Sequence, residues 1–175
     1  MTRLLAISGS LRSGSFNTAL LRAAQGLLPE GVTVELYEGL GDLPHFNPDL
    51  DVDQPPVQVA DLRGRIARAD GVLVCSPEYA HGVPGSLKNA LDWIVSSGEF
   101  TNKPTMLINA SPSFTGATIA QANLMEILRV MGANLPDSAI FSVSGVSRKV
   151  GSDGALDPQT ASAYRDALMA FIVSI

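Results

Sequence analysis

The chain has 175 residues, 46% hydrophobic and 17% charged, which is typical of a globular protein and excludes a disordered one. Its net charge is −5, and the longest basic run is Arg148-Lys149, which argues against nucleic acid as a partner. No apolar run approaches the roughly 18 residues of a membrane helix, and no signal peptide is recognised. We therefore expect a soluble cytoplasmic protein with no membrane partner.

Apolar runs typical of strands alternate with segments of helical period from the start of the chain to its end. Strands are predicted at residues 3–7, 32–36, 71–75, 105–110 and 139–143. Helices are predicted at residues 16–28, between the second and third strands, at 84–97, at 119–131, and in a last segment starting at Asp157 and Pro158. Residues 39–56 are expected to form an ordered surface excursion, and the apolar residues 167–175 a buried helix end.

This alternation predicts an α/β fold in which helices cover both faces of a parallel sheet. Five strands suit the flavodoxin-like order 2-1-3-4-5, a three-layer sandwich. No linker or internal repeat interrupts the pattern, so we expect one domain over residues 1–175.

The loop after the first strand, residues 8–17, has the properties of a phosphate site. Ligands of such sheets lie beyond the carboxyl ends of the strands, and this loop leads into a helix N-terminus, which favours anions. Arg12 adds a positive charge whose fork suits phosphate oxygens. A dinucleotide fingerprint would need glycine in place of Leu11, and a P-loop would need lysine in place of Ser15. With these two types of phosphate loop excluded, the remaining candidate ligand is a terminal monophosphate, such as that of FMN.

Two further loops should border the same site. Residues 75–89 follow the third strand, with Pro77 and Pro84 to stiffen the loop and Tyr79 to line or cover a flat ring. Taken alone, this segment is also compatible with an ordinary strand-to-helix connection. Residues 111–116 follow the fourth strand and are polar enough to complete a pocket.

At these loops the chain resembles the NADPH-dependent FMN reductase family, which includes bacterial quinone, chromate and azo-dye reductases. The family's phosphate loop reads approximately G-S-x-R-x-x-S-x-N, matched here by Gly9, Ser10, Arg12, Ser15 and Asn17. Its flavin loop reads approximately P-E-Y-N-x-x-x-P-G-x-L-K-N-x-x-D-W, matched from Pro77 to Trp93 except that Ala80 replaces asparagine. The similarity extends over nearly the whole chain.

The resemblance implies that FMN carries electrons from NADH or NADPH to a small acceptor such as a quinone, chromate or an azo compound. The implied cofactor-binding residues are Ser10, Arg12, Ser15, Phe16 and Asn17 in the first loop, Pro77, Glu78 and Tyr79 in the second, and Ser111 and Gly116 in the third. The second-loop residues would act chiefly through their backbone, leaving the Glu78 side chain to face solvent. The flavin would be the catalyst, so no side chain is assigned a catalytic role.

The resemblance also implies a homodimer or homotetramer, with the helix at residues 84–97 and its Trp93 as a contact surface.

His81 is interpreted either as a proton donor to a reduced quinone or as a surface histidine without special duty. Arg148 and Lys149 are interpreted either as ligands of the NADPH 2′-phosphate or as a solvated pair. Cys75, the only cysteine, is expected to be a buried strand residue. No Cys and His spacing suggests a metal site.

Two other classes of protein share this sheet. A flavodoxin-type electron carrier would bind FMN but dock to protein partners, and it would have a Thr-rich phosphate loop and a strongly acidic face. A response-regulator receiver would need acidic residues after the first and third strands, where Ser8 and Ser76 stand. The sequence therefore favours the reductase, with the carrier as its alternative.

Overall fold

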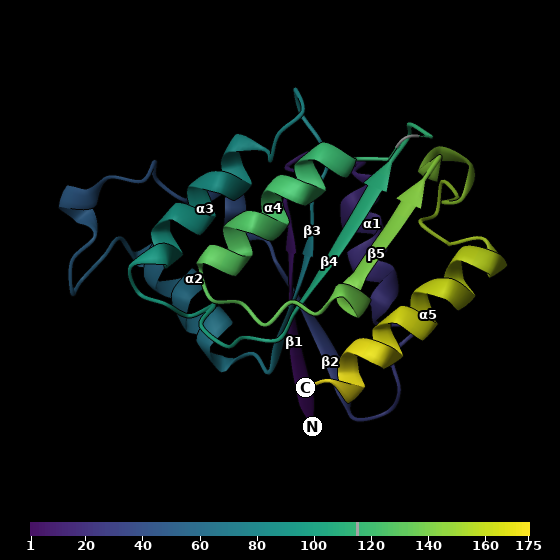
Figure 1. Ribbon diagram of the computed structural model, residues 1–175, viewed down its shortest axis with the longest axis horizontal. Helices are drawn as coiled ribbons and strands as arrows, with labels where there is room; N and C mark the ends of the chain where they lie inside the picture. Colours follow the sequence, from purple (N-terminus) through teal and green to yellow (C-terminus); the bar gives the residue numbers. More distant parts are fainter. Residues whose placement is uncertain (115) are drawn as a thin grey trace.

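The computed structural model describes residues 1–114 and 116–175. Within them, five parallel strands form one sheet of order β2-β1-β3-β4-β5, which confirms the predicted flavodoxin-like topology (Figure 1). The strands are β1 Thr2–Ser8, β2 Val32–Tyr37, β3 Gly71–Cys75, β4 Thr105–Ser111 and β5 Ile140–Ser144. All run in one direction, so the loops that follow them gather at one edge of the sheet.

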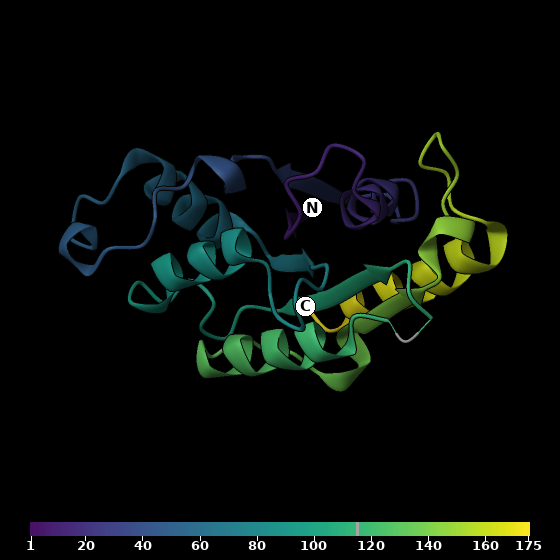
Figure 2. The same cartoon turned by 90° about the horizontal axis from the view of Figure 1, so that it is seen from above.

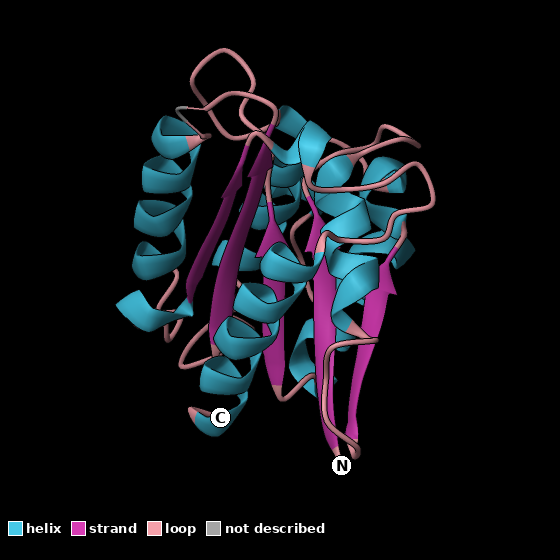
Figure 3. Cartoon of the chain, turned by 90° about the vertical axis from the view of Figure 1, so that its right-hand side faces the viewer, coloured by secondary structure: helices cyan, strands magenta, loops and turns pink. Residues whose placement is uncertain are grey.

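Helices cover the two faces of the sheet, which gives the three layers seen in Figure 3. They are α1 Phe16–Ala24, α2 Val57–Arg68, α3 Gly85–Val95, α4 Thr118–Val130 and α5 Pro158–Val173. Side chains alternate between the faces along each strand. In β1, Leu5 and Ile7 pack with α2, α3 and α4 in one core, while Leu4 and Ala6 pack with α1 and α5 in the other.

Residues 39–56 form the predicted surface excursion, with two 3-10 turns at Gly39–Asp42 and Pro48–Leu50. Part of this segment projects at the left of Figures 1 and 2. Two further 3-10 turns, Asp137–Ala139 and Val146–Arg148, flank β5.

The structure corrects two expectations about helices: the first helix is shorter than predicted, and the end of the last one is less buried. The first helix ends at Ala24. Beyond it, the N–H groups of Gly26 and Leu27 donate to the carbonyls three residues before them, Ala23 (3.2 Å) and Ala24 (2.9 Å), and the chain turns out of the α-helix. The apolar end of α5 is only partly buried, with Val173 84% exposed, because a single helical stripe faces the sheet. The buried stripe of α5 consists of Thr160, Tyr164, Leu168 and Phe171.

Trp93 does not lie on a contact surface. Its side chain is fully buried, its indole N–H donates to the Pro44 carbonyl (2.9 Å), and its ring packs edge-on against Phe46 at 5.0 Å between centroids. The residue therefore anchors the excursion of residues 39–56 to α3 within the same chain.

Candidate functional site

Three loops at the carboxyl edge of the sheet form the candidate site. Their described residues are 9–15 after β1, 76–84 after β3, and 112–114 with 116–117 after β4. The first loop lies against the start of the second, since the Gly9 N–H donates to the carbonyl of Cys75, the last residue of β3 (2.8 Å). A Cβ at Gly9 would lie 3.0 Å from Leu87 and 3.3 Å from Pro77. Glycine is favoured here because any larger residue would need these neighbouring side chains to shift.

The first loop ends in a capped helix with spare donors. Ser15 is the N-cap of α1, and its Oγ accepts from the Thr18 N–H (3.4 Å). Among the described residues, no acceptor is found for the backbone N–H groups of Ser13, Gly14, Phe16 and Asn17. These donors lie at the positive end of the α1 dipole, which is an environment suited to an anion.

Arg12 supplies the positive charge of this loop. Its side chain is exposed and donates to the Gly14 carbonyl (2.6 Å). Within the described part of the chain, it forms no ion pair with a carboxylate. Its charge is therefore available to a ligand.

Asn17 is buried and connects three elements. Its Nδ2 donates to the Ala110 carbonyl (3.3 Å), while its Oδ1 accepts from the Ala110 N–H (3.1 Å) and from the Cys75 thiol (3.2 Å). The Asn17 side chain thus ties α1 to β3 and β4. Cys75 is buried in β3 as expected, and burial raises the pKa of its thiol well above the ordinary value.

The tip of the second loop is a tight turn in a costly conformation. Tyr79 and Gly82 exchange two backbone hydrogen bonds of 3.1 and 3.0 Å. Between them, Ala80 and His81 have φ values of 50° and 59°, a region that favours glycine and asparagine. The asparagine usual in the family at position 80 would fit this backbone conformation better than alanine does.

The Glu78 side chain does not simply face solvent. Its Oε2 accepts from the backbone N–H groups of Ile119 (3.1 Å) and Ala120 (2.9 Å), in the first turn of α4. Its Oε1 lies 3.3 Å from His81 Nδ1. The hydrogen bond from Ala120, with smaller contributions from His81 and Ile119, lowers the pKa of this carboxyl.

The three loops enclose a cleft of about 600 Å³, within the range of small-molecule sites. All ten sequence-predicted residues line it: Ser10, Arg12, Ser15, Phe16, Asn17, Pro77, Glu78, Tyr79, Ser111 and Gly116. The cleft has four more lining residues, which the sequence interpretation did not single out as ligands: His81, Ala110, Pro112 and Ser113. Three of them belong to the loops already identified, and Ala110 is the penultimate residue of β4.

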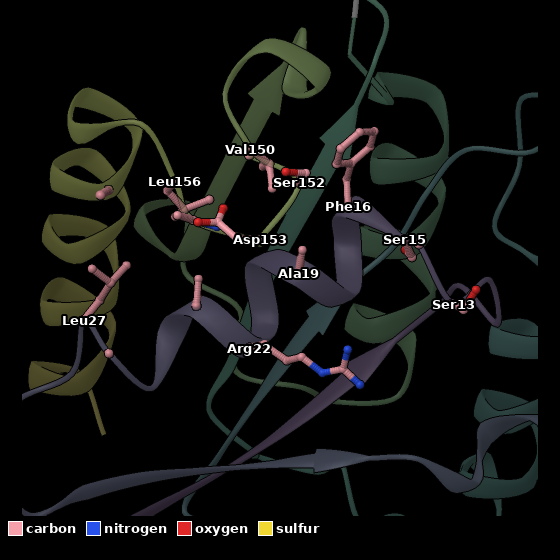
Figure 4. A pocket seen from close by; sticks show the side chains of 17 residues that line it. Ser13, Ser15, Phe16, Ala19, Arg22, Leu27, Val150, Ser152, Asp153 and Leu156 are labelled. Atoms are coloured by element: carbon pink, nitrogen blue, oxygen red, sulfur yellow. The ribbon is translucent and has the colours of Figure 1, made fainter.

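A second cavity, of about 740 Å³, lies between α1 and residues 150–156 (Figure 4). It shares only Ser15 and Phe16 with the predicted set, and neither the second nor the third loop lines it. We assign the site to the smaller cleft because that cleft collects the carboxyl ends of β1, β3 and β4, where ligands of this fold bind.

Arg148 packs on an aromatic ring beside the third loop. Its guanidinium lies 5.5 Å from the centre of the Phe114 ring, which is 76% exposed. The third loop contacts this region, since the Gly145 N–H donates to the Ser113 carbonyl (3.2 Å). The neighbouring Lys149 lowers the pKa of Asp157, after larger contributions from hydrogen bonds with Thr160 and Gln159.

Neither a metal cluster nor a membrane span is found in residues 1–114 and 116–175. No three His, Cys, Asp or Glu side chains lie close enough together to hold a metal ion. No helix combines the length and the apolar character needed to cross a bilayer.

Comparisons with known proteins point to one family. The model of the NADPH-dependent FMN reductase family matches residues 2–147. The chain is 39% identical to an NAD(P)H-dependent FMN reductase of Pseudomonas aeruginosa over 145 residues, which are 80% of this chain and 78% of that protein. It is 31% identical to a quinone reductase of Escherichia coli K12 over 161 residues, 90% of this chain and 82% of that protein.

A solved structure agrees with these relatives over almost the full length. The flavoenzyme NAD(P)H:(acceptor) oxidoreductase of Paracoccus denitrificans superposes with a TM-score of 0.86 and 32% identity, covering 98% of this chain and 96% of that one. The chain belongs to the NADPH-dependent FMN reductase family and is an FMN-dependent oxidoreductase.

Proposed function

We propose that the cleft between the three loops binds FMN and that the chain passes electrons from NADH or NADPH through it to a small acceptor. The observation that carries this proposal is the convergence of all ten predicted residues on one cleft with an anion-binding end. Reductases of quinones, of FMN and of other acceptors among the relatives support the acceptor class.

The electrostatics of the cleft favour one orientation of the cofactor. The first turn of α4 already binds an anion, since its N–H groups donate to the Glu78 carboxylate. The first turn of α1 has N–H groups for which the described residues offer no acceptor, and Arg12 lies beside it. The FMN phosphate therefore belongs at α1, held by Ser10, Arg12 and Ser15 and these N–H groups.

The ring would then lie toward the second and third loops. Pro77 and Tyr79 would border it on one side, and Ser111 and Gly116 on the other. Tyr79 is 55% exposed, so it can move without disturbing the core. Bound FMN supplies the redox chemistry, and the chain contributes binding and orientation, so we assign no catalytic side chain.

The finer features of the enzyme are part of the same proposal. We propose one FMN-binding domain over residues 1–175, located in the cytoplasm and assembled as a homodimer or homotetramer. Quinones, chromate and azo compounds are the acceptors to test. The nucleotide preference follows from the experiment below.

The decisive experiment is an anaerobic titration of the FMN-loaded protein, followed by its visible spectrum. Addition of NADPH, with NADH in parallel, should bleach the protein-bound flavin band, and a quinone added afterwards should restore it. The faster nucleotide identifies the preferred reductant. A bound flavin that neither nucleotide reduces would favour a flavodoxin-type carrier, and a protein that binds no FMN would overturn the proposal.

A further inference from the structure

Helix α4 is capped by a residue from a different loop. The helix follows Ala117, which has no side-chain acceptor for the first turn, and that turn contains no acidic residue. The Glu78 carboxylate accepts from Ile119 and Ala120 instead, at 3.1 and 2.9 Å. Its negative charge also lies at the positive end of the helix dipole. Glu78 thus performs the task of an N-cap from 41 residues away.

The same carboxylate holds the tip of the second loop. Ala80 has a positive φ, which is unfavourable for a residue with a Cβ, so contacts with the surroundings are needed to hold this turn. Glu78 contacts the His81 ring, and the Asn123 amide of α4 donates to the His81 carbonyl (3.4 Å). The tip is therefore docked on α4 by two side chains.

We propose that Glu78 is a positioning residue whose cap on α4 sets the separation of the second and third loops, and that its carboxylate does not bind the cofactor. The inference rests on the proposed FMN site. Pro77 and Tyr79 flank Glu78, while Ser111 and Gly116 precede α4, so one contact determines where both walls of the cleft stand. Preorganised walls spare the cofactor the cost of ordering them.

The chain contains a matched control for the loss of a capping carboxylate. Asp157 caps α5, and its Oδ1 accepts from the N–H groups of Gln159 and Thr160, both at 3.1 Å. Like Glu78, it binds two first-turn N–H groups, and its pKa is lowered by them. It does not line the cleft of about 600 Å³.

The test measures FMN affinity by flavin fluorescence and stability by urea unfolding of the cofactor-free full chain. Glu78→Ala and Asp157→Ala should both lower the urea midpoint, because each uncaps a helix. Only Glu78→Ala should weaken FMN binding, by about tenfold, since only that cap shapes the cleft. Glu78→Gln should recover most of the affinity, because its amide oxygen can still accept from both N–H groups.

The outcomes separate this inference from the proposed function. Wild-type affinity in Glu78→Ala, or an equal loss of affinity in Asp157→Ala, would overturn the positioning role. If Glu78→Gln binds FMN as weakly as Glu78→Ala, the charge of Glu78, and not its hydrogen bonds to α4, controls FMN binding, and the inference is wrong. Failure of the wild type to bind FMN would refute the proposed function itself.

Discussion

Asn17 and Ala110, 93 residues apart, exchange two hydrogen bonds: the Asn17 amide donates to the Ala110 carbonyl, and the Ala110 N–H donates to the Asn17 amide oxygen. Asn17 is only 4% exposed. Its side-chain amide therefore bonds to Ala110 as a neighbouring strand would, and joins the first turn of α1 to β4. Because Ser111 follows Ala110, this pair also fixes the first loop relative to the third.

Removal of this connection should destabilise the fold. Asn17→Ala leaves the buried Ala110 groups without partners, and we expect a loss of about 2 kcal/mol in the free energy of unfolding. Urea unfolding of the cofactor-free protein measures it. Asn134→Ala, at an exposed position, is the control and should change stability by less than about 0.5 kcal/mol. Equal effects of the two variants would contradict the role assigned to Asn17.

The turn at the tip of the second loop can be improved. Asparagine tolerates positive φ better than alanine, so Ala80→Asn should stabilise the protein by up to about 1 kcal/mol. Ala80→Val should destabilise it, because a β-branched residue is an outlier in this region. In thermal unfolding, the melting temperature should be highest for Ala80→Asn, intermediate for the wild type and lowest for Ala80→Val. A valine variant as stable as the wild type would show that the turn has another conformation in solution.

Arg12 should discriminate FMN from riboflavin, which lacks the phosphate. Arg12→Ala should weaken FMN binding by about tenfold or more and leave riboflavin binding nearly unchanged, because the lost hydrogen bonds are charge-assisted. Fluorescence titration with both flavins measures the ratio. Arg165→Ala, an exposed position on α5, is the control for a general loss of positive charge. If riboflavin binding falls equally, Arg12 supports the loop and does not recognise phosphate.

The ion pair of Asp51 and Arg63 should make stability depend on pH. A 2.5 Å hydrogen bond from Ser96 and a 2.7 Å contact with Arg63 lower the pKa of Asp51 from its ordinary value of 3.8. A carboxyl with a lowered pKa stabilises the fold above the unfolded value, and this contribution disappears as the pH falls through the folded value. Asp51→Asn should therefore be less stable than the wild type near neutrality.

The difference in stability between the wild type and Asp51→Asn should become smaller as the pH is lowered. Urea midpoints of both proteins at about pH 7 and about pH 3 test this, since the lower value lies below the ordinary pKa of the carboxyl. A gap of equal size at both pH values would mean that Asp51 acts through packing and not through its charge.

Cys75 should be inert in the native protein. Burial raises the pKa of its thiol, and the thiolate is the form that reacts. We expect slow labelling by a water-soluble disulfide reagent at neutral pH and fast labelling in denaturant. Rapid labelling of the folded chain would show that β3 opens locally.

Hydrophobic periodicity and turn residues, which can be read from a few neighbouring positions, were sufficient to predict the strands, the helices and the loops of the candidate site. Apolar runs such as residues 71–75 identified buried parallel strands, and Asp157 and Pro158 identified the start of α5. Arg12 and Ser15 were predicted to share one site, and both line the cleft. These signals are local because hydrogen bonding within a helix, a cap or a tight turn involves residues close in sequence.

Only the tertiary structure decided which distant groups meet. Sequence patterns contained no sign that Glu78 caps α4, that Asn17 pairs with Ala110, or that Trp93 is buried against the segment 39–56. The residue before α4, Ala117, provides no side-chain cap, so the first-turn N–H groups can donate to a carboxylate that folding brings close to them. Such pairings follow from the packing of loops at the sheet edge, which no short window of sequence encodes.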